Sequence, residues 1–319
     1  MACVVVGIAT MDVVHRIPGY PDEDTKTRIR ATRKARGGNG TNVLIVSAQL
    51  ACFASYHWIG SLVDPSTNAD ARFIVDDLSA HGVYTSSCQV HASGSMPTSH
   101  ILLSDANGSR TIFHHRELPE VSDEHVATAL ATLVDVAWIH FECREAQSQL
   151  RMIRIARATQ PHATISLEVE GPRHAWDDVQ PLLSHATYAF IAQGYVTSLG
   201  YATARDFFHA LATTATSELR AVVVPWGSDG AFVWCTATNC MDHVPVDPIP
   251  KPLDTVGAGD TLVGATISAL GAGLAIQDAV AIGCRVARTK CLQIGLEFEP
   301  TTLDTFRDDV VRSLRRSTM

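Results

Sequence analysis

A glycine-rich run near the C-terminus combines residues that can bind an oxyanion with one that can accept a proton. The run is Asp254-Thr-Val-Gly-Ala-Gly-Asp260, and a stretch of helical periodicity follows it. Glycines leave the backbone amides accessible at a helix start, where unpaired N–H groups and the helix dipole favour an anion. Asp260 falls in the first helical turn, where its carboxylate could take a proton from an attacking hydroxyl group. The run is therefore a candidate phosphate cradle (Thr255, Gly257, Ala258 and Gly259) beside a candidate general base.

Three other interpretations of this run compete. A Walker loop needs GxxxxGK[ST], which does not occur in the chain. A dinucleotide fingerprint needs GxGxxG soon after a strand, and here the third glycine is displaced to Gly264, near the C-terminus. The remaining alternative is a glycine-rich turn in which Asp260 only caps a helix, and the run alone leaves it open.

The surrounding pattern predicts the elements that must position this run. Short β-branched apolar runs alternate with helical stretches, which indicates βαβ units and a parallel sheet. Buried strands are expected near residues 2–9, 135–141, 163–169, 187–192 and 219–224. Helices are expected near residues 41–51, 69–80, 122–132, 145–158, 203–213, 258–270, 276–291 and 302–315. We therefore expect residues 1–319 to form a single domain of the α/β class, with a doubly wound and mainly parallel sheet flanked by helices.

Two stretches, residues 12–36 and 87–117, lack long helical periodicity. The segments 99–104 and 109–114 flank the turn signal Asn107-Gly108, which predicts a hairpin. We infer that these stretches form a small β-sheet lid on the α/β core. Ordinary edge strands of the main sheet are the alternative.

The composition excludes several classes of function. The formal net charge is −8 and 46% of residues are hydrophobic, which is typical of a globular protein and unlike a nucleic-acid binder. The densest basic stretch, residues 28–36, is interpreted as a solvated strand face, with a nucleic-acid patch as the alternative. The first apolar run reads as a buried strand, not a signal peptide, and no run reaches the ~18 to 20 apolar residues of a membrane span. The eight cysteines form no CxxC, so we expect reduced thiols and a cytoplasmic location.

A second run strengthens the case for phosphoryl chemistry. Arg36-Gly-Gly-Asn-Gly-Thr-Asn42 begins a predicted helix, and Asp12 follows the first strand. Together with the run 254–260, these residues resemble the PfkB, or ribokinase-like, carbohydrate kinase family over nearly the whole chain. Within that family, the closest likeness is to ketohexokinases. The phrases that carry it are residues 7–13, 93–97, 108–112, 138–144, 166–173, 283–287 and the pair Lys290-Cys291. The resemblance implies a ribokinase-like fold with a β-sheet lid, the use of ATP and Mg²⁺, and a homodimer formed through the lids.

The resemblance assigns the sugar side of the site to polar and glycine positions. Asp12, Asn39 and Asn42 would hydrogen-bond sugar hydroxyl groups, because carboxylates and amides can meet both their donors and their acceptors. Gly38 would let the backbone approach the sugar, and Arg144 would lie on the same side. The structural alternatives are a turn aspartate for Asp12, helix caps for the asparagines and a surface arginine at a helix start.

The phosphate side of the site is assigned in the same way. Arg110, on the predicted lid, would offset charge on the transferred phosphate, or would be a solvated hairpin arginine. Gly227 and Gly230 would line the nucleotide site together with Thr255, Gly257 and Gly259, or the first two would form a plain hairpin turn. Glu170 would position Mg²⁺ through water, or would cap a strand end.

The activity implied is transfer of the γ-phosphate of ATP to a ketose hydroxyl group, with fructose giving fructose 1-phosphate and Asp260 as the base. Three departures from the family pattern leave substrate and metal open: residues 192–197 lack an acid, Cys143 replaces a glycine, and no glycine follows Cys291 directly. One alternative is a family member acting on ribose, 2-keto-3-deoxygluconate or a nucleoside. The other is a sugar or nucleotide sensor without catalysis.

Overall fold

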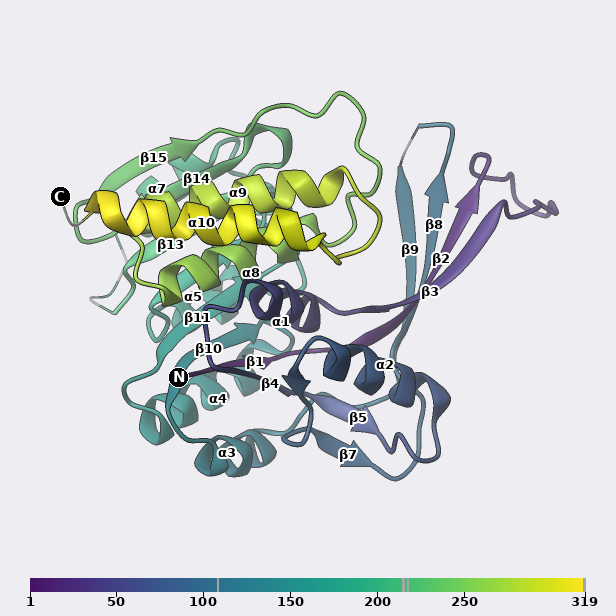
Figure 1. Ribbon diagram of the computed structural model, residues 1–319, viewed down its shortest axis with the longest axis horizontal. Helices are drawn as coiled ribbons and strands as arrows, with labels where there is room; N and C mark the ends of the chain where they lie inside the picture. The colour runs from purple at the N-terminus through teal and green to yellow at the C-terminus, as the bar shows by residue number, and fades with distance from the viewer. Residues whose placement is uncertain (108, 214–215, 217, 318–319) are drawn as a thin grey trace.

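A large, mostly parallel sheet runs through the centre of the molecule (Figure 1). The computed structural model describes residues 1–107, 109–213, 216 and 218–317, and nine strands from this part of the chain form the sheet. Their order is β15 (Cys240–Val244), β14 (Ala231–Cys235), β13 (Ala221–Pro225), β12 (Tyr188–Ile191), β11 (Thr164–Val169), β10 (Val136–Glu142), β1 (Ala2–Val6), β4 (Ser55–Ile59) and β6 (Val83–Tyr84). The strands from β13 to β6 are parallel, whereas β14 and β15 extend one edge as antiparallel strands.

Burial on both faces explains why these segments form strands. All five residues of β1 are buried, as expected for a parallel strand covered by helices on both sides. The five predicted strands correspond to β1, β10, β11, β12 and β13. The edge strands β14 and β15 were not predicted. In β15 no residue is fully buried, so its apolar signal is weak.

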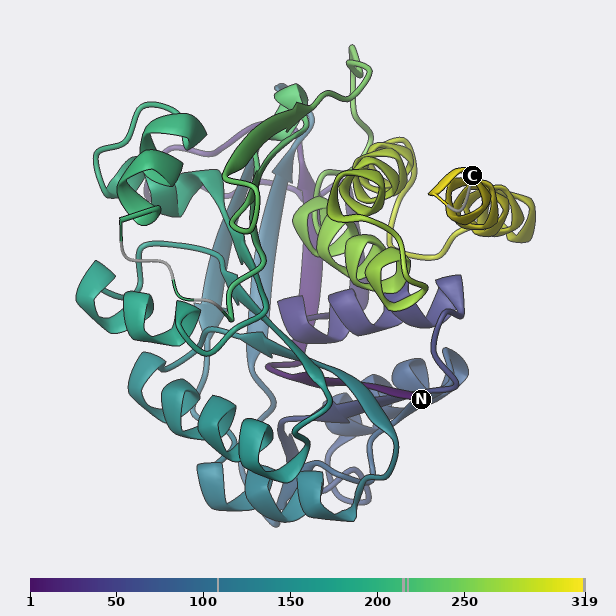
Figure 2. The same ribbon diagram turned by 90° about the vertical axis from the view of Figure 1, so that its left-hand side faces the viewer.

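Helices cover both faces of the sheet (Figure 2). One face packs against α1 (Asn39–Leu50), α2 (Ala69–Ala80), α8 (Ala258–Gly271) and α9 (Ile276–Cys291), with α10 (Pro300–Ser317) outside them. The other face packs against α3 (Asp123–Thr132), α4 (Ala146–Thr159), α5 (Trp176–Leu183), α6 (Gln193–Ser198) and α7 (Ala204–Leu211). All the predicted helices are present, with ends shifted by at most two residues, and the short α5 and α6 are additional. The doubly wound α/β class is therefore confirmed.

A separate four-stranded sheet projects from the core beside α1 and α2 (Figure 1). Its order is β3 (Ala31–Gly37), β2 (Thr10–Ile17), β8 (Thr98–Ser104) and β9 (Arg110–His115). We call it the lid sheet. The predicted hairpin is the antiparallel pair β8–β9, while Gly108 of its predicted turn lies outside the described residues. Residues 89–91 of the stretch assigned to the lid form β7 (Gln89–His91), which pairs with β5 (Ser61–Val63) in a sheet of its own.

The basic stretch on β3 is not a solvated face throughout. Arg36 is only 8% exposed, and Arg33 and Lys34 form ion pairs with Asp254 and Asp70. The interpretation of Arg36 as solvated is wrong, because the inner end of β3 packs against α2 and the Arg36 side chain bonds Asp77 of α2 and Thr41 and Asn42 of α1. In the described part of the chain, no helix is both long enough and apolar enough to cross a membrane.

Candidate active site

Two adjoining cavities lie where the lid sheet meets the carboxyl ends of the parallel strands. The polar cavity, of about 350 Å³, is enclosed by the lid sheet, the starts of α1 and α8, and residues that follow β10 and β11. The apolar cavity, of about 380 Å³, is enclosed by residues 225–230 and 246–252 together with α8 and α9. Pro225, Thr255, Ala258 and Gly259 line both, so the start of α8 lies between them. This edge of an open α/β sheet is where ligands usually bind.

The start of α8 has the geometry of an anion cradle. Gly257 adopts a left-handed φ of 78°, and no side chain among the described residues caps the helix. The first helical hydrogen bond runs from Thr261 N to Gly257 O over 2.9 Å. The amides of Gly259 and Asp260 precede that bond and are therefore available to an oxyanion.

Asp260 faces the polar cavity from the first turn of α8. Its side chain makes no capping bond, which disfavours the helix-cap interpretation. One carboxylate oxygen accepts a hydrogen bond from Asn42 Nδ2 at 2.6 Å. Burial, and then the nearby Glu168 carboxylate, raise the pKa of Asp260 well above its usual value, while the Asn42 bond opposes them. A carboxylate with a raised pKa is suited to accept a proton near neutral pH.

The start of α1 forms the opposite wall of the polar cavity. Gly38 has a φ of 100°, and a side chain there would clash with the carbonyl oxygen of Ile8. Asn39 and Asn42 line the cavity, and the described residues provide no side-chain cap for α1, so the capping alternative for the asparagines is not supported. The Asn42 amide nitrogen donates a hydrogen bond to Asp260, and the Asn42 amide oxygen accepts one from Arg36. Sequence reasoning assigned Asn42 to a sugar and did not foresee these partners.

The lid sheet contributes the roof of the polar cavity. Asp12 lies within β2, not in a turn, and burial raises the pKa of its carboxyl group. Ser99 and His114 line the cavity beside it. Arg110 reaches down from β9, and its Nη1 donates to Thr255 Oγ1 at 2.8 Å. The exposed lid arginine therefore contacts the candidate phosphate cradle directly, while it also remains a solvated residue of the β8–β9 hairpin.

Buried carboxylates form the floor of the polar cavity and were missed in part by the sequence analysis. Glu142 Oε2 accepts the amides of Ile8 at 3.0 Å and Gly40 at 3.1 Å, which ties the first strand to the start of α1. Arg144 pairs with Glu142 and Glu120 and is not a surface residue. The sequence signal for these carboxylates is a glutamate at or near the end of an otherwise apolar strand, as in β10 and β11.

The acidic residues at the end of β11 and directly after it have different environments. Glu168 is 7% exposed, and burial raises the pKa of its carboxyl group well above the usual value. Its Oε2 is buried without a hydrogen-bond partner among the described residues. Glu170 lies at the cavity rim and pairs with Arg173 at 2.9 Å. No group of three or more metal-binding side chains is found in the part of the chain that the structure describes.

Gly227 and Gly230 lie on the wall of the apolar cavity. They flank a short 3₁₀ turn between β13 and β14 and have positive φ angles of 60° and 87°. A side chain at Gly230 would clash with the carbonyl oxygen of Val244. The turn is thus both a hairpin connection and a cavity wall, and the assignment of the two glycines to a nucleotide site stays a prediction. Val246, Ile249 and Leu262 add flat apolar surface of the kind that suits an aromatic base.

A buried ion pair anchors the cradle from behind. Lys290, which is fully buried near the end of α9, donates to Asp254 O at 2.7 Å and lies 3.1 Å from Asp254 Oδ2. The same carboxylate accepts the amides of Val256 and Gly295. Sequence analysis used Lys290 only as part of a resemblance and did not predict this role.

Comparisons with known proteins bear on the whole chain. Residues 2–302 match the profile of the pfkB family carbohydrate kinases. The chain is 32% identical to the ketohexokinase of Mus musculus over 293 residues, covering 90% of this chain and 94% of the mouse protein. The ribokinase of Giardia lamblia has a TM-score of 0.79 at 16% identity, with 99% of both chains covered. The ribokinase of Arabidopsis thaliana, solved with ribose and ATP, has a TM-score of 0.78 at 18% identity, covering 96% of this chain and 99% of that one.

Proposed function

Because this chain belongs to the pfkB family of carbohydrate kinases and is an ATP-dependent phosphotransferase, we propose that its acceptor is a ketose, with fructose giving fructose 1-phosphate. The observation that carries the proposal is the placement of Asp260. Its buried carboxylate lines the polar cavity, which has room for a sugar, and it follows directly after Gly259, which also lines the apolar cavity, with room for a nucleoside. The identity to ketohexokinase supports the choice of a ketose.

The residues of the polar cavity suit sugar binding. Asp12 and Asn39 offer a carboxylate and an amide to vicinal hydroxyl groups, and Arg144 lies on the same side. The oxygen that reacts would approach Asp260, which accepts its proton as the oxygen attacks the γ-phosphorus. The bond from phosphorus to the bridging oxygen of ATP breaks, and ADP leaves with that electron pair.

The start of α8 stabilises the charge that develops during transfer. The amides of Gly259 and Asp260, on the wall of the polar cavity, would bind the transferred phosphate, and Arg110 would add a guanidinium from the lid. The adenine and ribose of ATP would occupy the apolar cavity beside Gly227 and Gly230. Most of the rate acceleration would come from positioning and electrostatics.

Magnesium would arrive with ATP and neutralise charge on its phosphate groups. The chain offers Glu170 at the cavity rim, where a carboxylate could receive water ligands of the ion. The Glu168 oxygen that lacks a hydrogen-bond partner among the described residues would offer an acceptor to a water ligand of the ion.

We also propose a homodimer formed through the lid sheets. All six residues of β9 are exposed, and it is an edge strand whose Phe113 is 59% exposed. An exposed apolar edge strand needs a partner or a cover. A second lid sheet would supply both and would close the polar cavity further.

The test is ADP release with MgATP across fructose, other ketoses, ribose, 2-keto-3-deoxygluconate and adenosine. We expect ketose-dependent turnover that falls by about 10² to 10⁴ in Asp260→Asn, the range of general-base catalysis. Turnover with another acceptor would keep the mechanism and replace the substrate. Binding of sugar or ATP without turnover across the panel would contradict the proposal and favour a sensor.

A further inference from the structure

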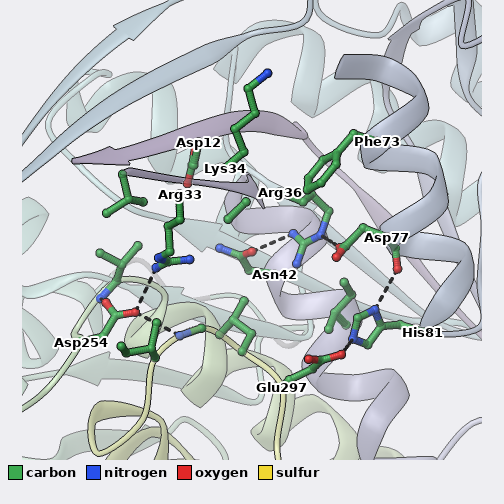
Figure 3. A pocket seen from close by; sticks show the side chains of 17 residues that line it. Asp12, Arg33, Lys34, Arg36, Asn42, Phe73, Asp77, His81, Asp254 and Glu297 are labelled. Carbon is green, nitrogen blue, oxygen red and sulfur yellow. Dashed lines mark hydrogen bonds and ion pairs between the residues drawn. The ribbon is translucent and has the colours of Figure 1, made fainter. Parts of the chain in front are cut away.

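Arg36 occupies an unusual position for an arginine outside the catalytic cavity. It lies at the inner end of β3, directly before the Gly37-Gly38 pair, and its side chain is 4% exposed. It lies on the wall of a third cavity of about 250 Å³, the back cavity (Figure 3). Asp12, Asn42 and Val256 line both the back and the polar cavities, so Arg36 approaches the active site from behind.

The Arg36 guanidinium is held in one orientation by three side chains. Its Nε donates to Asp77 Oδ2 at 2.6 Å, and its Nη1 donates to Thr41 Oγ1 at 2.9 Å and to Asn42 Oδ1 at 2.8 Å. Figure 3 shows the guanidinium between Asn42 and Asp77. Asp77 belongs to α2 and Asn42 to α1, so the Arg36 side chain links β3 to both helices.

This contact decides which end of the Asn42 amide faces Asp260. The guanidinium stays protonated and carries only hydrogen-bond donors. It can therefore bond only to the oxygen of the Asn42 amide. The amide nitrogen must then point the other way, where it donates to Asp260 at 2.6 Å. A rotated amide would set donor against donor at Arg36 and acceptor against acceptor at Asp260. Hydrogen bonds are therefore donated from Arg36 to Asn42 and from Asn42 to Asp260, while Asp77 anchors the guanidinium by accepting a separate bond from it.

We propose that Arg36 is a positioning residue for phosphoryl transfer, which acts through the Asn42 amide to hold the Asp260 carboxylate ready to receive the proton. The inference rests on the proposed function, because it assumes that Asp260 is the base. The bond from Asn42 lowers the pKa of Asp260 against burial and the Glu168 charge, which both raise it. Without Arg36 the amide is free to rotate, Asp260 loses its donor, and its pKa rises further.

Other charged groups line the polar cavity around Asp260, and none of them is replaced in the variants of Arg36 and Asn42 compared below. They are Asp12, Arg110 and His114 from the lid sheet, Glu142 and Arg144 at and after β10, and Glu168, Glu170 and Arg173 at and after β11. Because they are common to all variants, a difference in the titration of Asp260 comes from Arg36 itself. It acts either through the Asn42 amide or through the direct attraction between the Arg36 and Asp260 charges, and the double-mutant cycle below separates the two routes.

The test measures the pKa of Asp260 in the free enzyme by ¹³C NMR of labelled aspartate carboxyl groups, with Asp260→Asn assigning the signal. We expect Arg36→Gln to raise this pKa by about one unit or more, which is a tenfold change in the proton equilibrium. The acid limb of the kcat–pH profile should move to higher pH by the same amount, with the KM for ATP changed less than kcat. Lys34→Gln is the matched control, since it removes a basic residue of the same strand that pairs with Asp70 at the surface.

A double-mutant cycle tests whether the effect passes through Asn42. Asn42→Leu should raise the Asp260 pKa as Arg36→Gln does, and combining the two should add little further. Additive shifts would overturn the proposed route. A loss of stability with an unshifted pKa would assign Arg36 a purely structural role and overturn the inference.

The remaining outcomes are also decisive. If Arg36→Gln does not fold, Arg36→Lys keeps a charge beside Asp77 but lacks the planar fork, so a folded Arg36→Lys with an unshifted pKa would overturn the inference. If Asp260→Asn retains full turnover, the proposed base is wrong and the inference fails with it. If Asp260→Asn is inactive while the pKa of Asp260 in Arg36→Gln equals that of the wild type, the proposed base stands and only the inference about Arg36 is wrong.

Discussion

Replacing Lys290 with methionine tests how strongly the phosphate cradle depends on its buried ion pair. Lys290 is fully buried and Asp254 is 5% exposed, so neither charge has much access to water. Methionine preserves most of the side-chain volume but removes the ammonium, leaving the Asp254 carboxylate without its main counter-charge. Breaking a buried pair in this way typically costs about 3–5 kcal/mol.

The structure places the expected loss near the lower end of that range. The Asp254 carboxylate retains the amides of Val256 and Gly295 and a longer contact to Arg33 at 3.4 Å. It can also escape by taking up a proton, which costs a carboxyl group with an ordinary pKa of 3.8 roughly 4 kcal/mol at pH 7. We therefore expect Lys290→Met to lose about 3 kcal/mol of unfolding free energy.

The pH dependence of this loss has a defined sign. Burial alone would raise the pKa of Asp254, but Lys290 and the two amides outweigh it and lower the pKa below its usual value. A lowered pKa contributes stability that is present above the unfolded pKa, about 3.9, and is lost as pH falls through the folded pKa. In Lys290→Met the same carboxyl lacks its counter-charge, so its pKa is higher than in the wild type and it takes up a proton at a higher pH. The difference between wild type and Lys290→Met should accordingly be full near neutral pH, shrink as the pH falls through the acidic range and continue to shrink below about pH 4.

Urea unfolding at a series of pH values measures the loss, with Lys251→Met as the control at an exposed lysine. The control should stay within about 0.5 kcal/mol of wild type. Adding Asp254→Asn to Lys290→Met removes the stranded charge and should recover part of the stability. A loss below 1 kcal/mol, or a double variant that is no more stable than the single one, would refute the reasoning.

Three further predictions concern the cradle, the helix packing and the lid. Arg110→Met should lower kcat by about 10² to 10³ through loss of charge stabilisation at the cradle, measured by steady-state kinetics with saturating ATP; an unchanged kcat would remove Arg110 from the mechanism. Gly264→Ala should cost about 1–3 kcal/mol in thermal unfolding, because its Cβ would lie 2.5 Å from the carbonyl oxygen of Val43. Phe113→Lys should convert the proposed dimer to a monomer in light scattering, whereas an unchanged mass would refute the lid interface.

Local sequence was sufficient for the features that depend on neighbouring residues. Gly257 and Gly38 stand at helix starts whose backbone angles favour glycine. The strand Ala2–Val6 follows from its run of apolar residues. Asp260 was identified because a carboxylate in the first turn beside a glycine-rich cradle is a local pattern. The resemblance to a family extended these points to Asp12 and Asn39, which do line the polar cavity.

Long-range partners could not be predicted in the same way. The bond from Asn42 to Asp260 joins residues 218 positions apart, and Glu142 joins Ile8 across 134 positions. Arg36 belongs to a basic stretch whose composition indicates a solvated face, and only the packing of β3 against α2 and the bonds of the Arg36 side chain to α1 bury it. The same holds for Lys290, whose buried position is unusual for a lysine.

The physical reason for this division is that secondary structure and anion-binding backbone are encoded within a few residues, whereas pairing of buried charges depends on strand order and helix packing. The sequence by itself determined the α/β class, the cradle and the candidate base. Tertiary structure decided which groups surround that base: the Asn42 amide and its Arg36 partner on one side, the buried glutamates on another, and the Lys290–Asp254 pair behind the cradle.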